Sequence, residues 1–137
     1  MLRKDAKVEL MRGVPLFSGC SKRELAQIAS VADEISFNEG RTLIQEGRRG
    51  REFIVVLDGS VEVRKGGRKL PTRGGTSFFG ELALLTDAPR SATVTTTTPV
   101  RALVITDQAF RRLLSSSPTI QTKVLQSLAE RLAPELI

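Results

Sequence analysis

The sequence predicts a mainly β protein with helices at both ends, and three observations support this class. Short runs rich in β-branched residues fill the middle of the chain, over residues 34–106. Turn residues, chiefly Gly, Asp and Asn, separate these runs at regular intervals, which is typical of sandwiches and barrels. Helical periodicity is confined to residues 1–33 and 107–137. A chain of 137 residues can bury a substantial core, so we expect a single domain built from these three segments.

The N-terminal segment should contain two short helices. The spacing of apolar residues from Leu2 to Leu10 predicts a helix over residues 2–12. Ser21 and Glu24 have the spacing of a capping box, in which each side chain bonds to the backbone N–H of the other residue. They predict a second helix over about 22–31.

The central segment should consist of short strands. Asp58-Gly59 lies between two β runs and predicts a two-residue hairpin. Alternation of Val61 and Val63 with charged residues predicts that one face of their strand is buried. Four consecutive threonines at 95–98 suit an exposed strand. The expected strands lie at residues 35–37, 42–44, 53–57, 60–64, 68–72, 91–98 and 100–105.

The C-terminal segment should form two helices. Asp107 is a suitable cap for the first, the serines at 115–117 interrupt it, and Pro118 suits the first position of the second. The second helix carries an apolar stripe at Ile120, Val124, Leu128 and Leu132, which is either a lid over a ligand or the seam of a homodimer. The stripe is shorter than three heptads, so we favour a lid.

The composition argues against most catalytic chemistry. The chain contains no His and a single Cys, Cys20. The usual zinc, iron and copper sites, and Ser-His-Asp or Cys-His catalysis, depend on these residues. A metal-dependent enzyme on a small β-barrel is therefore disfavoured, and we expect no enzyme activity, no catalytic residues, no metal and no cofactor. One Cys cannot form an intrachain disulfide, which fits a reducing compartment.

The net charge of +6 raises the question of nucleic-acid binding. Basic residues cluster at 48–51 and at 64–69, in or beside predicted turns, and no aromatic residues are interleaved for base stacking. We interpret both clusters as solvated turns and expect no direct nucleic-acid binding. The charged N-terminus and the lack of a long apolar run favour a cytoplasmic protein without a membrane span.

Residues 78–94 have the chemistry of a site for a small phosphorylated ligand. A Gly-rich loop ending at Gly80 opens a short apolar helix, whose first N–H groups and partial positive charge favour an anion. Arg90 follows a turn, and its planar guanidinium can hold two phosphate oxygens. Glu81 has the wrong charge for phosphate but can accept a hydrogen bond from a sugar hydroxyl. The small residues that leave room for a ligand are Gly80, Ala83 and Ala92.

These residues resemble the phosphate-binding cassette of cyclic-nucleotide-binding domains. That pattern runs F-G-E-L/I-A-L-x(4)-P-R-A/S/T-A-T/S-V, and Phe79–Val94 match it without a gap. Two other segments are similar to the family: E-G-x-x-G-x-x-F at Glu46–Phe53 and L-D-G-S-V-E-V at Leu57–Val63. The resemblance extends from about Val14 to Leu132. It implies an eight-stranded antiparallel jelly-roll barrel flanked by helices.

The resemblance also implies a 3′,5′-cyclic nucleotide inside the barrel. Arg90 would pair with the cyclic phosphate and Glu81 would accept the ribose 2′-hydroxyl. Backbone N–H groups around Leu82, Ala83 and Ala92 would complete the phosphate site. The ligand-binding residues expected on this basis are Gly80, Glu81, Leu82, Ala83, Arg90, Ser91, Ala92, Val63 and Leu70.

The sequence predicts the identity of the nucleotide base less well than it predicts the phosphate site. The family often has Ala at the position of Ser91 in cAMP binders and Thr in cGMP binders, so Ser91 does not decide between them. We favour cAMP because free-standing domains of this type look bacterial. Val63 and Leu70 are expected either to wall the base or to be ordinary core residues.

The resemblance implies a regulatory module that binds and reports. Occupancy would move the C-terminal helices, with the serines at 115–117 as the hinge, and the signal would pass to an unknown effector protein or domain. One alternative is the sensor half of a cyclic-nucleotide-responsive transcription regulator without its DNA-binding part. Another is a docking domain that keeps the fold and binds no nucleotide, against which the intact Glu81 and Arg90 argue.

Overall fold

The computed structural model describes residues 2–71 and 77–132, except for the side chains of residues 81, 82, 131 and 132. The chain divides into two compact units. The β unit is Asp33–Gln108, and the helical unit combines Met1–Ala32 with Ala109–Ile137. Each unit has its own internal packing and is described by itself.

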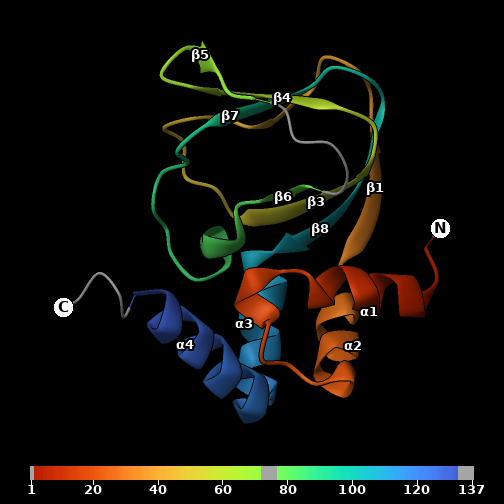
Figure 1. Cartoon of the computed structure of the whole chain (residues 1–137), viewed down its shortest axis with the longest axis vertical. Coiled ribbons are helices and arrows are strands. Elements are labelled where there is room, and N and C mark those ends of the chain that lie inside the picture. The colour runs from red at the N-terminus through yellow and green to blue at the C-terminus, as the bar shows by residue number, and fades with distance from the viewer. Residues whose placement is uncertain (1, 72–76, 133–137) are drawn as a thin grey trace. The chain divides into compact units, whose positions relative to one another are not determined.

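The β unit consists of two antiparallel four-stranded sheets (Figure 1). The strand order is β1-β8-β3-β6 in the first sheet and β2-β7-β4-β5 in the second, which is the order of a jelly roll. The expected fold class, mainly antiparallel β with flanking helices, is confirmed. The strands are β1 Asp33–Phe37, β2 Thr42–Ile44, β3 Glu52–Asp58, β4 Val61–Lys65, β5 Arg68–Lys69, β6 Ser77–Phe79, β7 Thr93–Thr96 and β8 Val100–Thr106, and a short 3-10 helix, η2, spans Glu81–Leu84.

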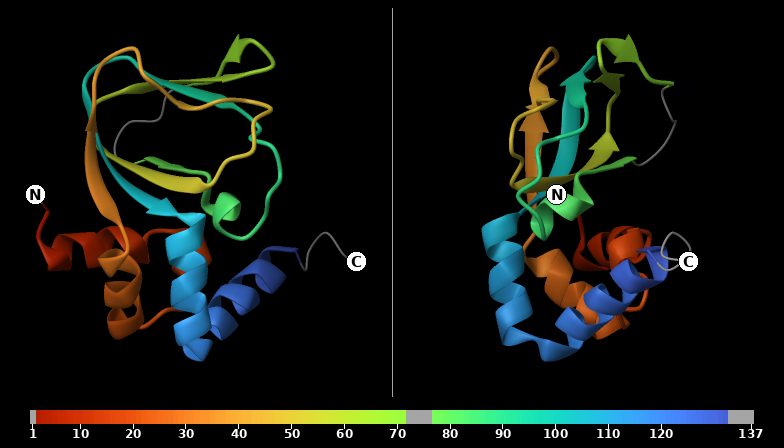
Figure 2. Two further views of the ribbon diagram at one scale, coloured as in Figure 1. Left: turned by 180° about the vertical axis from the view of Figure 1, so that it is seen from behind. Right: turned by 90° about the vertical axis from the view of Figure 1, so that its left-hand side faces the viewer.

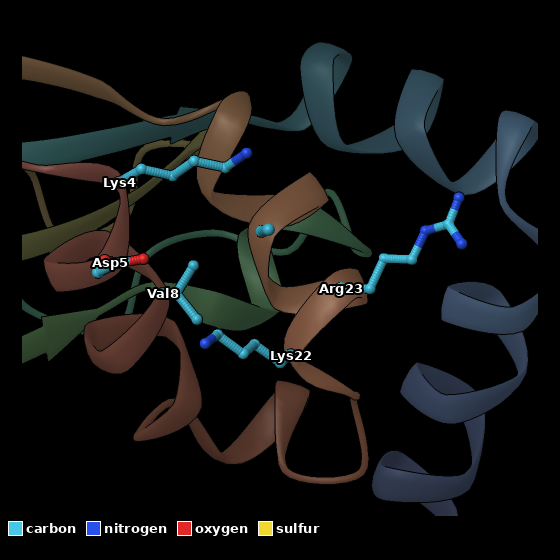
Figure 3. Close-up of a pocket in the computed structure, with 6 residues that line it drawn as sticks. Lys4, Asp5, Val8, Lys22 and Arg23 are labelled. Carbon is cyan, nitrogen blue, oxygen red and sulfur yellow. The ribbon is translucent and has the colours of Figure 1, made fainter.

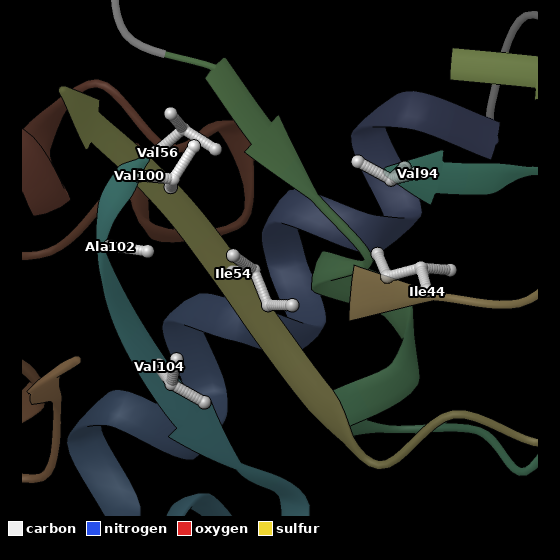
Figure 4. Packing of buried hydrophobic residues seen from close by; sticks show 7 residues of the cluster. All are labelled: Ile44, Ile54, Val56, Val94, Val100, Ala102 and Val104. Carbon is white, nitrogen blue, oxygen red and sulfur yellow. The ribbon is translucent and has the colours of Figure 1, made fainter. Parts of the chain in front are cut away.

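The core of the β unit lies between the two sheets (Figure 4). Strands β3 and β8 contribute Ile54, Val56, Val100, Ala102 and Val104, while β2 and β7 contribute Ile44 and Val94. Val61 and Val63 pack against this cluster from β4, so the buried face expected from their alternation is confirmed. The scarcity of aromatic residues is thus met by a core of branched aliphatic side chains.

The hairpin expected at Asp58-Gly59 is wrong. The turn joins β3 of the first sheet to β4 of the second, and these strands do not pair with each other. Both edges of β3 are already taken, by β6 on one side and β8 on the other. A turn signal shows that the chain reverses, but it carries no information about which strand becomes the neighbour.

The expectation of an exposed threonine strand is also wrong at one position. Thr96 is only 2% exposed. Its Oγ1 donates to the carbonyl of Asn38 at 2.7 Å and accepts from the N–H of Arg41 at 2.8 Å. A buried hydroxyl with both functions satisfied stabilises the β1–β2 loop. Thr93 acts similarly, since its Oγ1 accepts from the N–H of Glu46 at 3.0 Å.

The helical unit combines elements from both ends of the chain (Figure 2). The capping box is confirmed, because the side chains of Ser21 and Glu24 each accept a hydrogen bond from the other residue's backbone N–H. Only Ser117 separates the last two helices, so the expected break at 115–117 is confined to one residue. The helices are α1 Lys4–Arg12, η1 Pro15–Phe17, α2 Lys22–Ser30, α3 Asp107–Ser116 and α4 Pro118–Leu132.

Three contacts join α3 and α4 to the N-terminal elements. The rings of Phe17 and Phe110 lie 5.7 Å apart between centroids. Ser127 Oγ donates to the carbonyl of Pro15 at 2.9 Å. An ion pair links Lys123 on α4 to Glu24 on α2. No helix in the described part of the chain has both the length and the apolar character needed to cross a membrane.

Candidate functional site

Arg90, the residue expected to bind phosphate, lies in the β unit between η2 and β7. Its backbone makes two hydrogen bonds: the N–H of Arg90 donates to the carbonyl of Arg48 at 2.7 Å, and the carbonyl of Arg90 accepts from the N–H of Gly47 at 2.8 Å. Its side chain is only 8% exposed. The guanidinium donates to the carbonyl of Glu52 and lies 3.7 Å from that residue's carboxylate. The loop before β3 therefore fixes the backbone of Arg90, and the first residue of β3, Glu52, fixes its side chain.

Two glycines border the Arg90 side chain. A Cβ placed on Gly50 would lie 1.5 Å from Arg90 Nε, and one on Gly80 would lie 2.0 Å from Arg90 Nη1. Neither position leaves room for any side chain while Arg90 keeps this conformation. Gly80 also has a φ of +81°, which L-residues rarely adopt. The absence of side chains at these two glycines therefore leaves the space that the Arg90 side chain occupies.

The electrostatics of Arg90 favour an incoming anion. Burial lowers the pKa of the Arg90 guanidinium, and the nearby Glu52 carboxylate partly opposes that shift. Arginine nevertheless stays charged near neutral pH, so the site holds a partly desolvated cation. Glu52 compensates it weakly, because the Glu52 side chain is 47% exposed. A guanidinium has five N–H donors, and the described residues offer it acceptors on Glu52 alone.

The other cassette residues lie close by in the sequence but differ in accessibility. Ala83 is 9% exposed, and its N–H donates to the carbonyl of Gly80 at 3.0 Å, so that N–H is engaged in this structure. Ser91 is exposed and Ala92 is half-buried. The backbone of Glu81 and Leu82 forms the first turn of η2, whereas their side chains lie outside the described residues.

The two residues expected near the base lie next to each other. The N–H of Leu70 donates to the carbonyl of Val63 at 2.8 Å, across the β4–β5 pair. Val63 packs against the core between the sheets, and Leu70 is 37% exposed. Val63 is therefore half-buried beside the core, while Leu70 retains accessible apolar surface.

Two residues of this site were missed by reasoning from sequence. Gly50 stands in the E-G-x-x-G-x-x-F segment, so a signal existed, but only the structure shows that its missing side chain makes space for Arg90. Glu52 gave no signal, because it reaches Arg90 across 38 residues of sequence.

The comparisons with known proteins identify the family. Residues 34–117 match the cyclic nucleotide-binding domain, so the chain belongs to that family. Its relatives include a cAMP-dependent protein kinase regulatory subunit of Mycosarcoma maydis, with 38% identity over 82% of this chain and 23% of that protein. They also include a CRP-like cAMP-activated global transcriptional regulator of Mycobacterium tuberculosis, with 29% identity over 90% of this chain and 58% of that protein.

A solved structure agrees with this assignment. The N-terminal domain of a transcriptional regulator from Streptomyces coelicolor A3(2) matches with a TM-score of 0.81 and 30% identity, over 92% of this chain and 94% of that one. The chain spans about a quarter of the kinase subunit and somewhat over half of the mycobacterial regulator. The chain is therefore a cyclic nucleotide-binding domain, and the relatives named here are a kinase regulatory subunit and two transcriptional regulators.

Proposed function

We propose that this domain binds cAMP in preference to cGMP, without chemically changing it, and signals occupancy to an effector. The observation that carries the proposal is Arg90, a buried guanidinium to which the described residues offer acceptors only on Glu52, at the position that the cassette assigns to the cyclic phosphate. A cyclic phosphate carries one negative charge, which would neutralise the desolvated cation. The names of the kinase and transcription-factor relatives support cAMP as the nucleotide.

The remaining roles follow the cassette. We assign the ribose 2′-hydroxyl to Glu81, the phosphate oxygens to backbone N–H groups of Leu82, Ala83 and Ala92, and the base to Val63 and Leu70. The N–H of Ala83 is bonded to Gly80 in this structure. Its use by phosphate would therefore require η2 to rearrange, which couples ligand binding to a change in local structure.

We propose that the signal is a movement of the C-terminal helices. Since α4 is joined to η1 and α2 through Ser127 and Lys123, a swing of α4 alone would break a hydrogen bond and an ion pair. A movement that carries the N-terminal helices with α4 would preserve both. We therefore favour the helical unit as the moving body and all 137 residues as one sensor domain.

In a second proposed function, the domain is the sensor part of a transcriptional regulator. The chain resembles an N-terminal domain of a transcriptional regulator over nearly the full length of both chains, and the mycobacterial regulator over 90% of this chain. In that case the effector would be a DNA-binding domain.

Isothermal titration calorimetry of the chain with cAMP, cGMP and 5′-AMP tests the proposal. We expect saturable 1:1 binding of cAMP, weaker binding of cGMP, and little heat from 5′-AMP, which lacks the cyclic phosphate. Absence of heat with both cyclic nucleotides would favour the docking-domain alternative. Ser91→Ala separates the roles of its hydroxyl: a larger loss for cGMP indicates contact with guanine, and equal losses indicate contact with phosphate.

A further inference from the structure

An open groove lies between α1 and α2 of the helical unit, and the cassette takes no part in it. Its volume is about 460 Å³, and it is lined by Lys4, Asp5, Val8, Lys22, Arg23 and Ala26. Figure 3 shows Lys4, Asp5 and Val8 entering from α1, and Lys22 extending from α2 toward Val8. Arg23 extends away from α1 and from Val8.

The groove combines an apolar floor with a positive rim. Val8 is 3% exposed and closes the base of the groove, where the half-buried Ala26 presents apolar surface. Lys4, Lys22 and Arg23 contribute three cations against the single carboxylate of Asp5. Within the described residues, none of these four charged side chains makes a hydrogen bond or an ion pair, and all four residues are exposed.

The positive charge of the protein is concentrated in the same unit. The helical unit contains ten Lys and Arg against five Asp and Glu, whereas the β unit contains eleven against ten. An acidic partner approaching the chain is therefore attracted mainly to the helices.

We propose that this groove is a docking site for an acidic segment of a partner protein. The segment places an apolar side chain over Val8 and Ala26 and carboxylates beside Lys4 and Lys22. Apolar burial supplies the anchor, and charge complementarity sets the choice and orientation of the segment. The surface belongs to the helical unit, so it is independent of the nucleotide assignment and offers a place for an effector to engage.

The dimensions and composition favour a peptide over a nucleic acid. The volume suits one or two side chains, and the groove has an apolar base that a phosphate backbone would leave unused. Its lining contains no aromatic residue on which a base could stack. A short acidic peptide uses both the floor and the rim.

The test uses the full chain and a fluorescein-labelled nonapeptide with a central Leu flanked by Glu on both sides. Fluorescence anisotropy should show saturable binding at micromolar concentration. Replacing the central Leu by Ser, or all Glu by Gln, should weaken binding at least tenfold. Equal binding of the Ser peptide would overturn the anchor, and tighter binding of a labelled single-stranded oligonucleotide would overturn the choice of a peptide.

Matched variants separate the groove from general electrostatics. Lys22→Glu with Arg23→Glu should weaken peptide binding at least tenfold, and acidic residues in the first turn of α2 are compatible with the helix. Lys65→Glu with Arg68→Glu makes the same charge change on the exposed β4–β5 hairpin and should leave binding within about twofold. Equal losses of peptide affinity in the two double variants would show that only the net charge of the protein matters, and this would overturn the groove as the docking site.

A third variant tests the floor of the groove, and chemical-shift changes locate the peptide on the protein. Ala26→Leu fills the floor without changing charge and should also weaken peptide binding. Amide chemical-shift changes on adding the Glu-Leu peptide should centre on α1 and α2. Shifts centred elsewhere would overturn the proposal. Retained cAMP binding by the groove variants would keep this result distinct from the nucleotide site.

Discussion

A partly buried ion pair in the β unit, Arg90–Glu52, and one in the helical unit, Glu24–Lys123, are built in opposite ways. In the β unit the cation is buried: the side chain of Arg90 is 8% exposed and that of Glu52 is 47% exposed. In the helical unit the anion is buried: Glu24 is 9% exposed and Lys123 is 34% exposed. The pairs thus differ in the charge that is shielded from water: the cation in the β unit and the anion in the helical unit.

The buried anion is fully compensated. Glu24 accepts from Lys123 and, at 2.7 Å, from the N–H of Ser21. These hydrogen bonds lower the pKa of Glu24 to about 2, against an ordinary value of 4.5. The pair leaves Glu24 little to gain from another ligand, and it stabilises the contact between α2 and α4.

The buried cation is only partly compensated. The Glu52 carboxylate stands 3.7 Å away and faces water, and burial lowers the pKa of Arg90. The described residues give Arg90 a hydrogen bond to the Glu52 carbonyl but no carboxylate closer than 3.7 Å, so a phosphate would satisfy its charge better than Glu52 does. The comparison teaches that the structural pair of Glu24 is complete by itself, whereas the proposed binding pair leaves Arg90 available to a ligand.

The largest expected effect comes from removing the buried cation. Arg90→Ala should weaken cAMP binding by roughly 3–5 kcal/mol, as for breaking a buried ion pair, while the melting temperature without ligand barely falls. Arg90→Lys keeps the charge but loses the two-pronged geometry, so it should recover only part of the affinity. Calorimetry and thermal unfolding measure the two quantities. Unchanged affinity in Arg90→Ala would contradict the assignment of the phosphate site.

The second prediction concerns the pH dependence of the stability that the Glu24–Lys123 pair contributes. The pKa of Glu24 in the folded state is about 2, below its ordinary value of 4.5. The stability it contributes is therefore present above pH 4.5 and is lost as the pH falls toward 2. The contribution is on the order of 3 kcal/mol. Denaturant unfolding at several pH values should show a shallower acid dependence for Glu24→Gln; parallel curves would refute the role of this pair.

The third prediction concerns the space that Arg90 occupies. Gly50→Ala adds a Cβ where the Arg90 side chain lies, so the guanidinium should be displaced and cAMP affinity should fall by about 1–3 kcal/mol, as for overpacking. Gly19→Ala is the control, because the nearest atom to its added Cβ is 4.0 Å away. Equal affinities for the two variants would show that Arg90 binds in a different conformation.

The smallest effect should come from the exposed partner of the binding pair. Glu52→Gln removes a carboxylate that competes with phosphate for Arg90, so cAMP should bind a few-fold more tightly, in line with the small free energy of exposed ion pairs. The gain should shrink at high salt. Weaker binding would instead make Glu52 a positioning residue for the guanidinium.

The sequence by itself determined the class of the protein and the identity of the cassette. Alternation, turn residues and capping signals are local, so they predicted the described strands other than β6, the capping box at Ser21 and Glu24, and the buried face of β4. The same local signals failed at Asp58-Gly59 and at Thr96, where pairing and burial depend on distant segments.

Only the tertiary structure decided the surroundings of the key side chains. Glu52 meets Arg90 across 38 residues, and Lys123 meets Glu24 across 99. No pattern along the chain encodes such a pairing, because it arises when the sheet and the helices bring remote segments together. The groove between α1 and α2 has the same origin. The sequence therefore predicted Arg90 as the ligand-binding cation, and the fold decided that its side chain is buried, confined by Gly50 and Gly80, and paired among the described residues with Glu52.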